Sequence, residues 1–233
     1  MAILTATVPV GMLASTSASA ELSASATIAS SYLWRGFELG TGTPAISADL
    51  VYSNSGFYAG VWVSSGDTTG GTEYDLFAGY GGSIGESITY DISYATYIYP
   101  TGDYQLSDGS PGDFAEAILN IGLGPVSLTY KENVAGDTAF PSDVISPGDD
   151  GVLGGPGYAL SSDYSYVSID TSAGDFSFTL GSHDGAVDDS MHFDVSYAAT
   201  ENLAFTFSTI VDSDNSAGEP EPTVVASYSI PLM

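Results

Sequence analysis

The chain has 233 residues, no cysteine, and 29 acidic residues against two basic ones, which gives a net charge of −27. Nucleic acid is excluded as a partner, because phosphate binding requires clustered Lys and Arg side chains. No apolar run reaches the roughly 18 residues that a spanning helix needs, so we expect no helical membrane anchor. The length fits a single domain.

The first 20 residues have the composition of a targeting segment. They are apolar and small, and they end in Ser17-Ala18-Ser19-Ala20, which is typical of the cleavage site of a signal peptide. The basic segment that usually precedes the apolar run is missing, as it would be if Met1 were an internal start. We therefore expect a signal peptide over 1–20 and one mature domain over 21–233.

From residue 22 onward the chain alternates apolar and polar side chains in short stretches. This period of two is that of β-strands, whose successive side chains point to opposite faces. The clearest examples are 88–94, 191–197 and 203–208. Twelve strands are expected in all, the others being 22–35, 45–53, 57–64, 74–82, 114–122, 126–132, 158–169, 176–183 and 223–232.

The connections between these strands are alternately short and long. Every second one is a tight turn rich in Gly, Asn, Ser or Pro, at 54–56, 82–86, 123–125, 172–174 and 200–202. The remaining connections include the long segments 100–113, 133–157 and 212–222. Short turns at one end and long loops at the other are typical of bacterial outer-membrane barrels. We therefore predict an all-β fold, a closed antiparallel transmembrane β-barrel of about 12 strands.

Seven charged residues fall inside the predicted strands. They are Arg35, Asp49, Asp75, Asp91, Glu116, Lys131 and Asp194. Strand parity places them opposite the apolar face, and a charge facing lipid would be costly, so we expect all seven to face the lumen. Two cations among carboxylates in a narrow lumen predict a charged constriction. Salt bridges between adjacent strands would place the same residues there without any transport role.

The stretch Ser31-Tyr32-Leu33-Trp34-Arg35-Gly36 begins a family resemblance. It continues through Gly42-Thr43-Pro44, Gly56-Phe57-Tyr58-Ala59-Gly60-Val61-Trp62 and Glu73-Tyr74-Asp75-Leu76-Phe77-Ala78-Gly79-Tyr80. Over about residues 28–100 the chain resembles the TorF-type family of porins. The resemblance implies a signal peptide, a monomeric outer-membrane barrel and a porin role. It implies no catalytic residues and names no solute.

These observations predict an outer-membrane porin, not an enzyme, that passes small hydrophilic or cationic solutes. Its expected partners are outer-membrane lipid and lipopolysaccharide, and no cofactor is expected. Asp137, Asp143, Asp149 and Asp150 are candidate ligands for weakly bound calcium, but the sequence favours a solvated acidic loop as the explanation of these residues. Two alternatives remain open, namely a soluble acidic all-β protein that binds calcium or carbohydrate, and a barrel without a channel that serves as an adhesin or structural protein.

Overall fold

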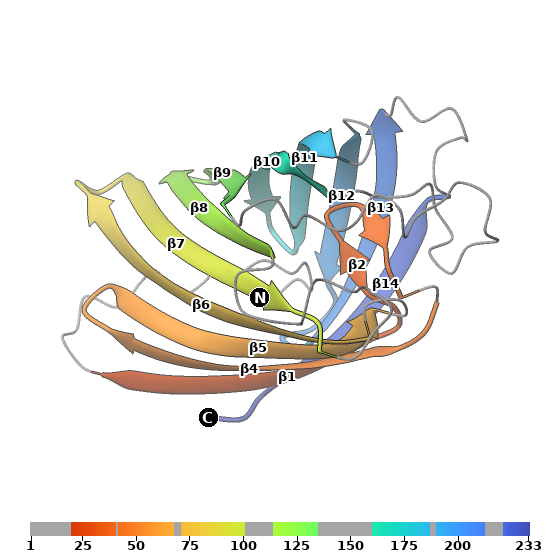
Figure 1. The fold of residues 1–233 in the computed structure, drawn as a ribbon, viewed down its shortest axis with the longest axis horizontal. Helices are drawn as coiled ribbons and strands as arrows, with labels where there is room; N and C mark the ends of the chain where they lie inside the picture. The colour runs from red at the N-terminus through yellow and green to blue at the C-terminus, as the bar shows by residue number, and fades with distance from the viewer. Residues whose placement is uncertain are drawn as a thin grey trace.

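A computed structural model describes residues 20–40, 42–67, 71–100, 114–134, 160–186, 190–212 and 221–233. Twelve long strands form one closed antiparallel barrel, in which β1 pairs with both β4 and β14 (Figure 1). The predicted fold class is confirmed. The barrel strands are β1 (Glu21–Ala29), β4 (Ala45–Asn54), β5 (Phe57–Asp67), β6 (Gly71–Ile84), β7 (Ile88–Ile98), β8 (Phe114–Leu123), β9 (Val126–Asn133), β10 (Leu160–Ala173), β11 (Phe176–Ala186), β12 (Met191–Ala198), β13 (Leu203–Asp212) and β14 (Thr223–Pro231).

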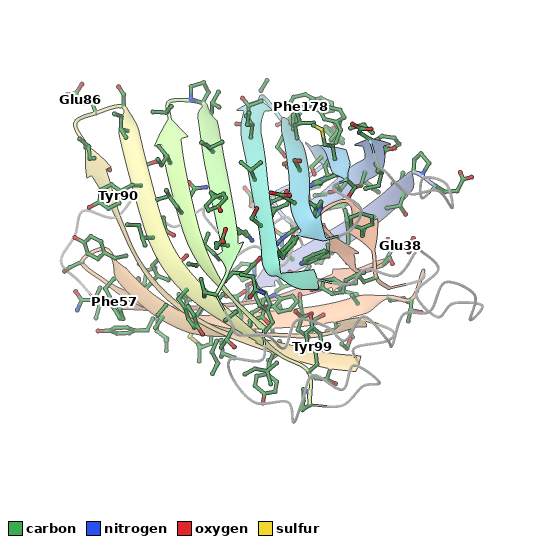
Figure 2. The ribbon with its side chains drawn as sticks, turned by 45° about the horizontal axis from the view of Figure 1, so that its top comes forward. Glu38, Phe57, Glu86, Tyr90, Tyr99 and Phe178 are labelled. Carbon is green, nitrogen blue, oxygen red and sulfur yellow. The ribbon has the colours of Figure 1, made fainter. Side chains whose placement is uncertain are left out.

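Tight turns join the strands at one end of the barrel. Ser55 and Gly56 connect β4 to β5, and both have positive φ angles, 52° and 86°, as a two-residue hairpin turn requires. Glu86 lies in the turn between β6 and β7, far from Glu38 (Figure 2). The predicted long loops lie largely outside the described residues, as does the predicted signal peptide apart from Ala20. Within the described part of the chain, no helix is long and apolar enough to cross a membrane.

Side chains sort onto the two faces of the wall as the alternation predicts. In β7, Ile92 is 61% exposed on the outside, whereas its neighbours Asp91 and Ser93 are buried on the inside. In β6, Leu76 is exposed, and Asp75 and Phe77 are buried. The outer face therefore carries a continuous series of large apolar side chains, among them Leu50, Phe57, Ile92, Leu119, Leu128, Ile169, Leu180, Phe205 and Val224.

The first predicted strand, 22–35, is wrong beyond Ala29. Pairing between β1 and β4 ends at Ala29 and Ala45, and the chain then leaves the wall and turns inward. It forms a separate two-stranded hairpin from β2 (Leu33–Trp34) and β3 (Phe37–Glu38) (Figure 1). We call residues 30–40 the inner hairpin. Tyr32 and Trp34 share the apolar parity of Ile28, and Ser31 and Arg35 share the polar parity of Thr27, which is why the sequence predicts one uninterrupted strand although Ser30 and Leu33 depart from the pattern.

The inner hairpin turns at Arg35 and Gly36. Both residues have positive φ angles, 46° and 92°, which is the requirement of a type I′ turn. A side chain at Gly36 would meet the wall, because an added Cβ would lie 2.4 Å from Cβ of His192. At the base of the hairpin, Tyr32 and Leu33 pack in a buried cluster with Val225. The hairpin is thus fitted closely to the interior at its tip and at its base.

Candidate functional site

The inner hairpin contacts the barrel wall in many directions. At its base, the Tyr32 hydroxyl donates a hydrogen bond of 2.8 Å to Glu73 of β6. At its tip, the ring of Phe37 packs edge-on against His183 of β11, with centroids 5.4 Å apart. Further contacts reach Trp62 of β5, Glu116 of β8, Tyr164 of β10, His192 of β12, Ile210 of β13 and Thr223 of β14. The hairpin therefore spans the lumen at this level.

Arg35 occupies the centre of the site, at the tip of the hairpin. Its Nη1 and Nη2 donate two parallel hydrogen bonds of 2.7 and 2.6 Å to the two oxygens of Glu116. The guanidinium carbon lies 4.8 Å from the ring centroids of both Trp34 and Tyr166, within cation–π range. Burial opposes the charged guanidinium, but Glu116 outweighs it and raises the pKa of Arg35 well above its ordinary value. Arg35 is therefore a permanently charged, fully enclosed cation.

A second layer of groups surrounds this ion pair. Tyr97 donates a hydrogen bond of 2.6 Å to Glu116. Asp75 of β6 shares a side-chain hydrogen bond with Glu73 and interacts electrostatically with Glu116 and with Lys131 of β9, the strand that pairs with β8. Lys131 and Asp75 are only 2% and 6% exposed. Nevertheless Nζ of Lys131, Oδ1 of Asp75 and Nε of Arg35 have no hydrogen-bond partner among the described residues.

His183 completes a closed circuit of hydrogen bonds at the hairpin tip. The carbonyl oxygen of Arg35 can only accept, so Nε2 of His183 donates to it across 3.0 Å. Nδ1 of His183 then accepts from the Tyr164 hydroxyl at 3.1 Å, and that hydroxyl accepts from Nη1 of Arg35 at 2.7 Å. These contacts fit a neutral imidazole with its proton on Nε2.

His192 is engaged in the same manner on the next strand. It contacts Asp194 at 3.1 Å and the Tyr166 hydroxyl at 2.9 Å. Both ring nitrogens of both histidines thus contact tyrosine, aspartate or backbone groups. Within the described part of the chain, no serine hydroxyl is a hydrogen-bond partner of either imidazole ring.

The seven charged residues predicted to face the lumen divide into two groups. Arg35, Asp75, Glu116 and Lys131 converge at the site, but Arg35 reaches it from the inner hairpin and not from a wall strand. The remaining three lie elsewhere on the inner wall. Asp49 accepts from Ser25, Asp91 from Tyr58, and Asp194 from Ser208. The seven residues do not form a single ring of charge.

The predicted calcium ligands cannot be placed. Asp137, Asp143, Asp149 and Asp150 all lie outside the described residues. Within the described ranges no group of three or more His, Asp or Glu side chains is arranged to hold a metal ion. Calcium binding in this loop stays a prediction.

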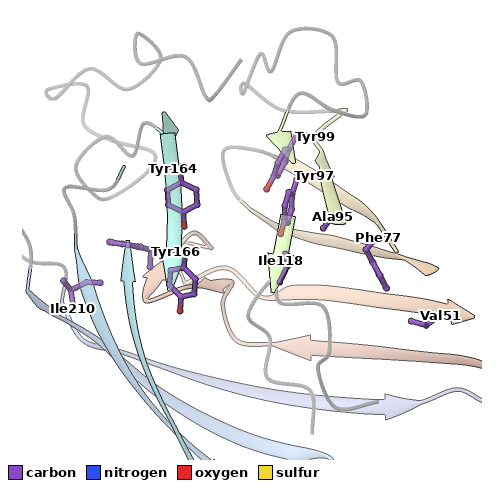
Figure 3. Close-up of a cluster of buried hydrophobic side chains, with 10 residues drawn as sticks. Val51, Phe77, Ala95, Tyr97, Tyr99, Ile118, Tyr164, Tyr166 and Ile210 are labelled. Carbon is purple, nitrogen blue, oxygen red and sulfur yellow. The ribbon is translucent and has the colours of Figure 1, made fainter. Parts of the chain in front are cut away.

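Several residues of the site were missed by the sequence analysis. Tyr97, Tyr164 and Tyr166 belong to one cluster of buried side chains inside the barrel (Figure 3). Strand parity contained the signal, because Tyr97 shares a face with Asp91 and Tyr166 shares one with Ser168. For Tyr32 and Trp34 no such signal existed, since their inward position depends on where the chain leaves the wall.

Residues 13–217 match a family model described as "Bacterial protein of unknown function (Gcw_chp)". The chain belongs to this family. The description does not carry the TorF name, so the TorF-type resemblance remains an expectation from the sequence. Comparison with curated proteins finds no significant match.

Solved structures with a similar fold are outer-membrane barrels. A KdgM porin has 8% identity over 91% of this chain and 99% of that chain, with a TM-score of 0.47. Outer membrane phospholipase A from Escherichia coli has 11% identity over 91% and 89%, with a TM-score of 0.43. OprD from Pseudomonas aeruginosa has 12% identity over 92% and 67%, with a TM-score of 0.39. At these levels of similarity, no functional argument follows, and the barrel itself rests on the strand pairing.

Proposed function

We propose that the chain is an outer-membrane porin, a monomeric passive channel for small hydrophilic solutes, as the TorF-type resemblance implies. The observation that carries the proposal is the inverted polarity of the barrel. Large apolar side chains such as Ile92 and Leu180 cover the outside, whereas carboxylates and hydroxyls line the inside. A soluble barrel would hide its apolar face, so this distribution suits surrounding lipid and lipopolysaccharide on the outside and a wet lumen within.

A preference for cations follows from the charge balance. The inner wall carries the carboxylates of Asp49, Asp91 and Asp194, whose hydrogen bonds go to side chains of the wall and not to the inner hairpin. The chain has only two basic residues, and one of them, Arg35, is already paired with Glu116. An acidic lumen raises the local concentration of cations and lowers that of anions. Reversal potentials in a salt gradient should favour K⁺ over Cl⁻, and more so at low ionic strength.

The inner hairpin favours a second candidate, a barrel that does not conduct. Its contacts with β6, β8, β11 and β14 occupy the lumen at the level of Glu116. In the porin proposal, this hairpin must move or leave space beside it for solutes to pass. In the second candidate it is a permanent plug, and the barrel acts through its loops.

Removing the hairpin distinguishes the two candidates. Ala29 and Ala45 are directly paired, so a two-residue Asn-Gly turn in place of 30–44 preserves the β1–β4 ladder. In planar bilayers the porin proposal predicts conductance in the wild type and a larger, cation-selective conductance in the variant. If the hairpin-free variant folds but carries no current, the channel is refuted. If the wild type carries no current under any condition, the plugged barrel is favoured.

Membrane residence needs a separate test. A closed barrel should migrate faster in detergent gels before boiling than after it, because the unboiled barrel stays compact. Single-band behaviour together with solubility in detergent-free buffer would favour the soluble acidic alternative. Titration with calcium or oligosaccharide would then be the next measurement.

A further inference from the structure

We propose that Glu116, Tyr97, Tyr164 and Tyr166 form a binding site for solutes that bear a guanidinium or ammonium group. We call these four residues the cation cradle. In this structure the chain's own Arg35 occupies the cradle as a tethered ligand. The proposal deepens the porin function and rests on it for its physiological role, but binding to the cradle can be measured without ion current.

The contacts of Arg35 describe what the cradle recognises. The two oxygens of Glu116 accept the parallel donors of the guanidinium at 2.7 and 2.6 Å, which is the bidentate geometry of a planar cation. The Tyr164 hydroxyl accepts a third hydrogen bond at 2.7 Å. The Tyr166 ring lies against the guanidinium carbon at 4.8 Å. Carboxylate, hydroxyl and ring face all belong to barrel strands, so they persist when the hairpin leaves.

A second observation points to a cationic ligand. Asp75 is 6% exposed, interacts electrostatically with Glu73, Glu116 and Lys131, and shares a side-chain hydrogen bond with Glu73, but its Oδ1 lacks a hydrogen-bond partner among the described residues. A buried acceptor without a donor is costly. Arg35 donates to Glu116 but makes no hydrogen bond to Oδ1 of Asp75. A free cation that is not tethered to the hairpin could donate to Glu116 and also to this oxygen.

Arg35 belongs to the inner hairpin, which can leave the lumen without disrupting the barrel wall. Beyond Ser30, whose N–H donates to the carbonyl of Ala226 in β14, the inner hairpin adds no strand pairing to the wall, since β2 and β3 pair only with each other and β1 pairs directly with β4. With the hairpin in place, Nζ of Lys131 and Nε of Arg35 also lack partners within the described structure. Hydration of these groups would partly compensate for the hydrogen bonds that break when the hairpin leaves. A soluble cation can therefore compete with Arg35 for the cradle.

Lys131 lowers the affinity of the cradle for cations. Its ammonium group interacts electrostatically with Arg35 and with Glu116. A positive charge beside the cradle opposes a second cation, so Lys131 should weaken binding of any solute there. Replacing Lys131 with methionine keeps most of the side-chain volume and removes that opposition.

The test is chemical complementation of the empty cradle. Arg35→Ala protein in detergent micelles is titrated with ethylguanidinium chloride, and binding is measured by calorimetry and by the shift in unfolding temperature. NaCl at matched ionic strength is the control for screening. We expect saturable binding and a rise in unfolding temperature for Arg35→Ala, a weaker effect for the wild type whose cradle is filled, and tighter binding when Lys131→Met is added.

Two further variants keep the proposal falsifiable. The Asn-Gly replacement of 30–44 also leaves the cradle empty, and it serves if Arg35→Ala does not fold. Glu116→Gln, added to Arg35→Ala or to the Asn-Gly variant, should abolish the saturable binding of ethylguanidinium. Equal binding with and without Glu116, or no binding to a folded protein with an empty cradle, would overturn the proposal. If ethylguanidinium binds to the cradle but the barrel shows no conductance, the porin function is refuted and the binding site is retained.

Discussion

Arg35 and Glu116 lie 81 residues apart in the chain and meet inside the barrel through two parallel hydrogen bonds. One partner is on the inner hairpin and the other on β8, a strand of the wall. Substitutions of this pair therefore perturb the hairpin while leaving the ladder of barrel hydrogen bonds intact. The hairpin and the wall can accordingly be altered separately.

Arg35→Ala should release the hairpin and leave the barrel folded. Removing one partner of a buried ion pair costs about 3 to 5 kcal/mol if the remaining charge stays buried. Here Glu116 avoids that cost, because departure of the hairpin lets water reach it. We expect a severalfold larger conductance and a stronger preference for cations, with the unboiled form still migrating fast in detergent gels. An unchanged current, or loss of the fast-migrating form, would contradict this prediction.

Gly36→Ala should expel the hairpin for a steric reason. The new Cβ would lie 2.4 Å from Cβ of His192, and φ at Gly36 is 92°. Gly85→Ala is the matched control, because Gly85 has a φ of 65° but nothing within 4 Å of an added Cβ. The control should cost roughly 1 to 2 kcal/mol of backbone strain and leave the current unchanged. Equal conductance changes in both variants would show that the contact with His192 is unimportant.

Tyr164→Phe should loosen the hairpin without emptying the cradle. It removes the hydroxyl between Arg35 and His183 and leaves Nδ1 of His183 without its donor. The loss of such a buried partner is about 1 to 3 kcal/mol. Amide hydrogen exchange should accelerate at Leu39, whose N–H bonds to Tyr32 O, and stay unchanged in β13. Tyr94→Phe, on the outer face of β7, is the control and should leave exchange at Leu39 as in the wild type.

Two adjacent residues of β11 test the orientation of the wall. Leu180 is 41% exposed on the outer face, whereas Thr179 donates a hydrogen bond of 2.6 Å to Asp170 on the inner face. Leu180→Arg should cost roughly 2 to 4 kcal/mol if it lies near the membrane midplane. Thr179→Arg should insert normally, since Asp170 can pair with the new charge. Refolding yields into liposomes measure both, and equal yields would mean that the faces are assigned wrongly.

The sequence alone determined the barrel. Period-two alternation fixes which side chains share a face, and alternating turn and loop lengths fix the antiparallel order, because both are local properties of the chain. The inward positions of Asp75, Asp91 and Glu116 follow from that pattern, and the structure places them on the inner wall.

The end of β1 could not be determined from the sequence. Tyr32 and Trp34 share the parity of Ile28, and Ser31 shares that of Thr27, so the local pattern is compatible both with a strand in the wall and with one that turns inside. The decision depends on partners far away in the chain, namely Glu73 for Tyr32, Glu116 for Arg35 and the backbone space at Gly36 beside His192. Such contacts exist only once the barrel has closed around the hairpin. The wall is therefore set by local periodicity, whereas the contents of the lumen are set by long-range packing and charge pairing.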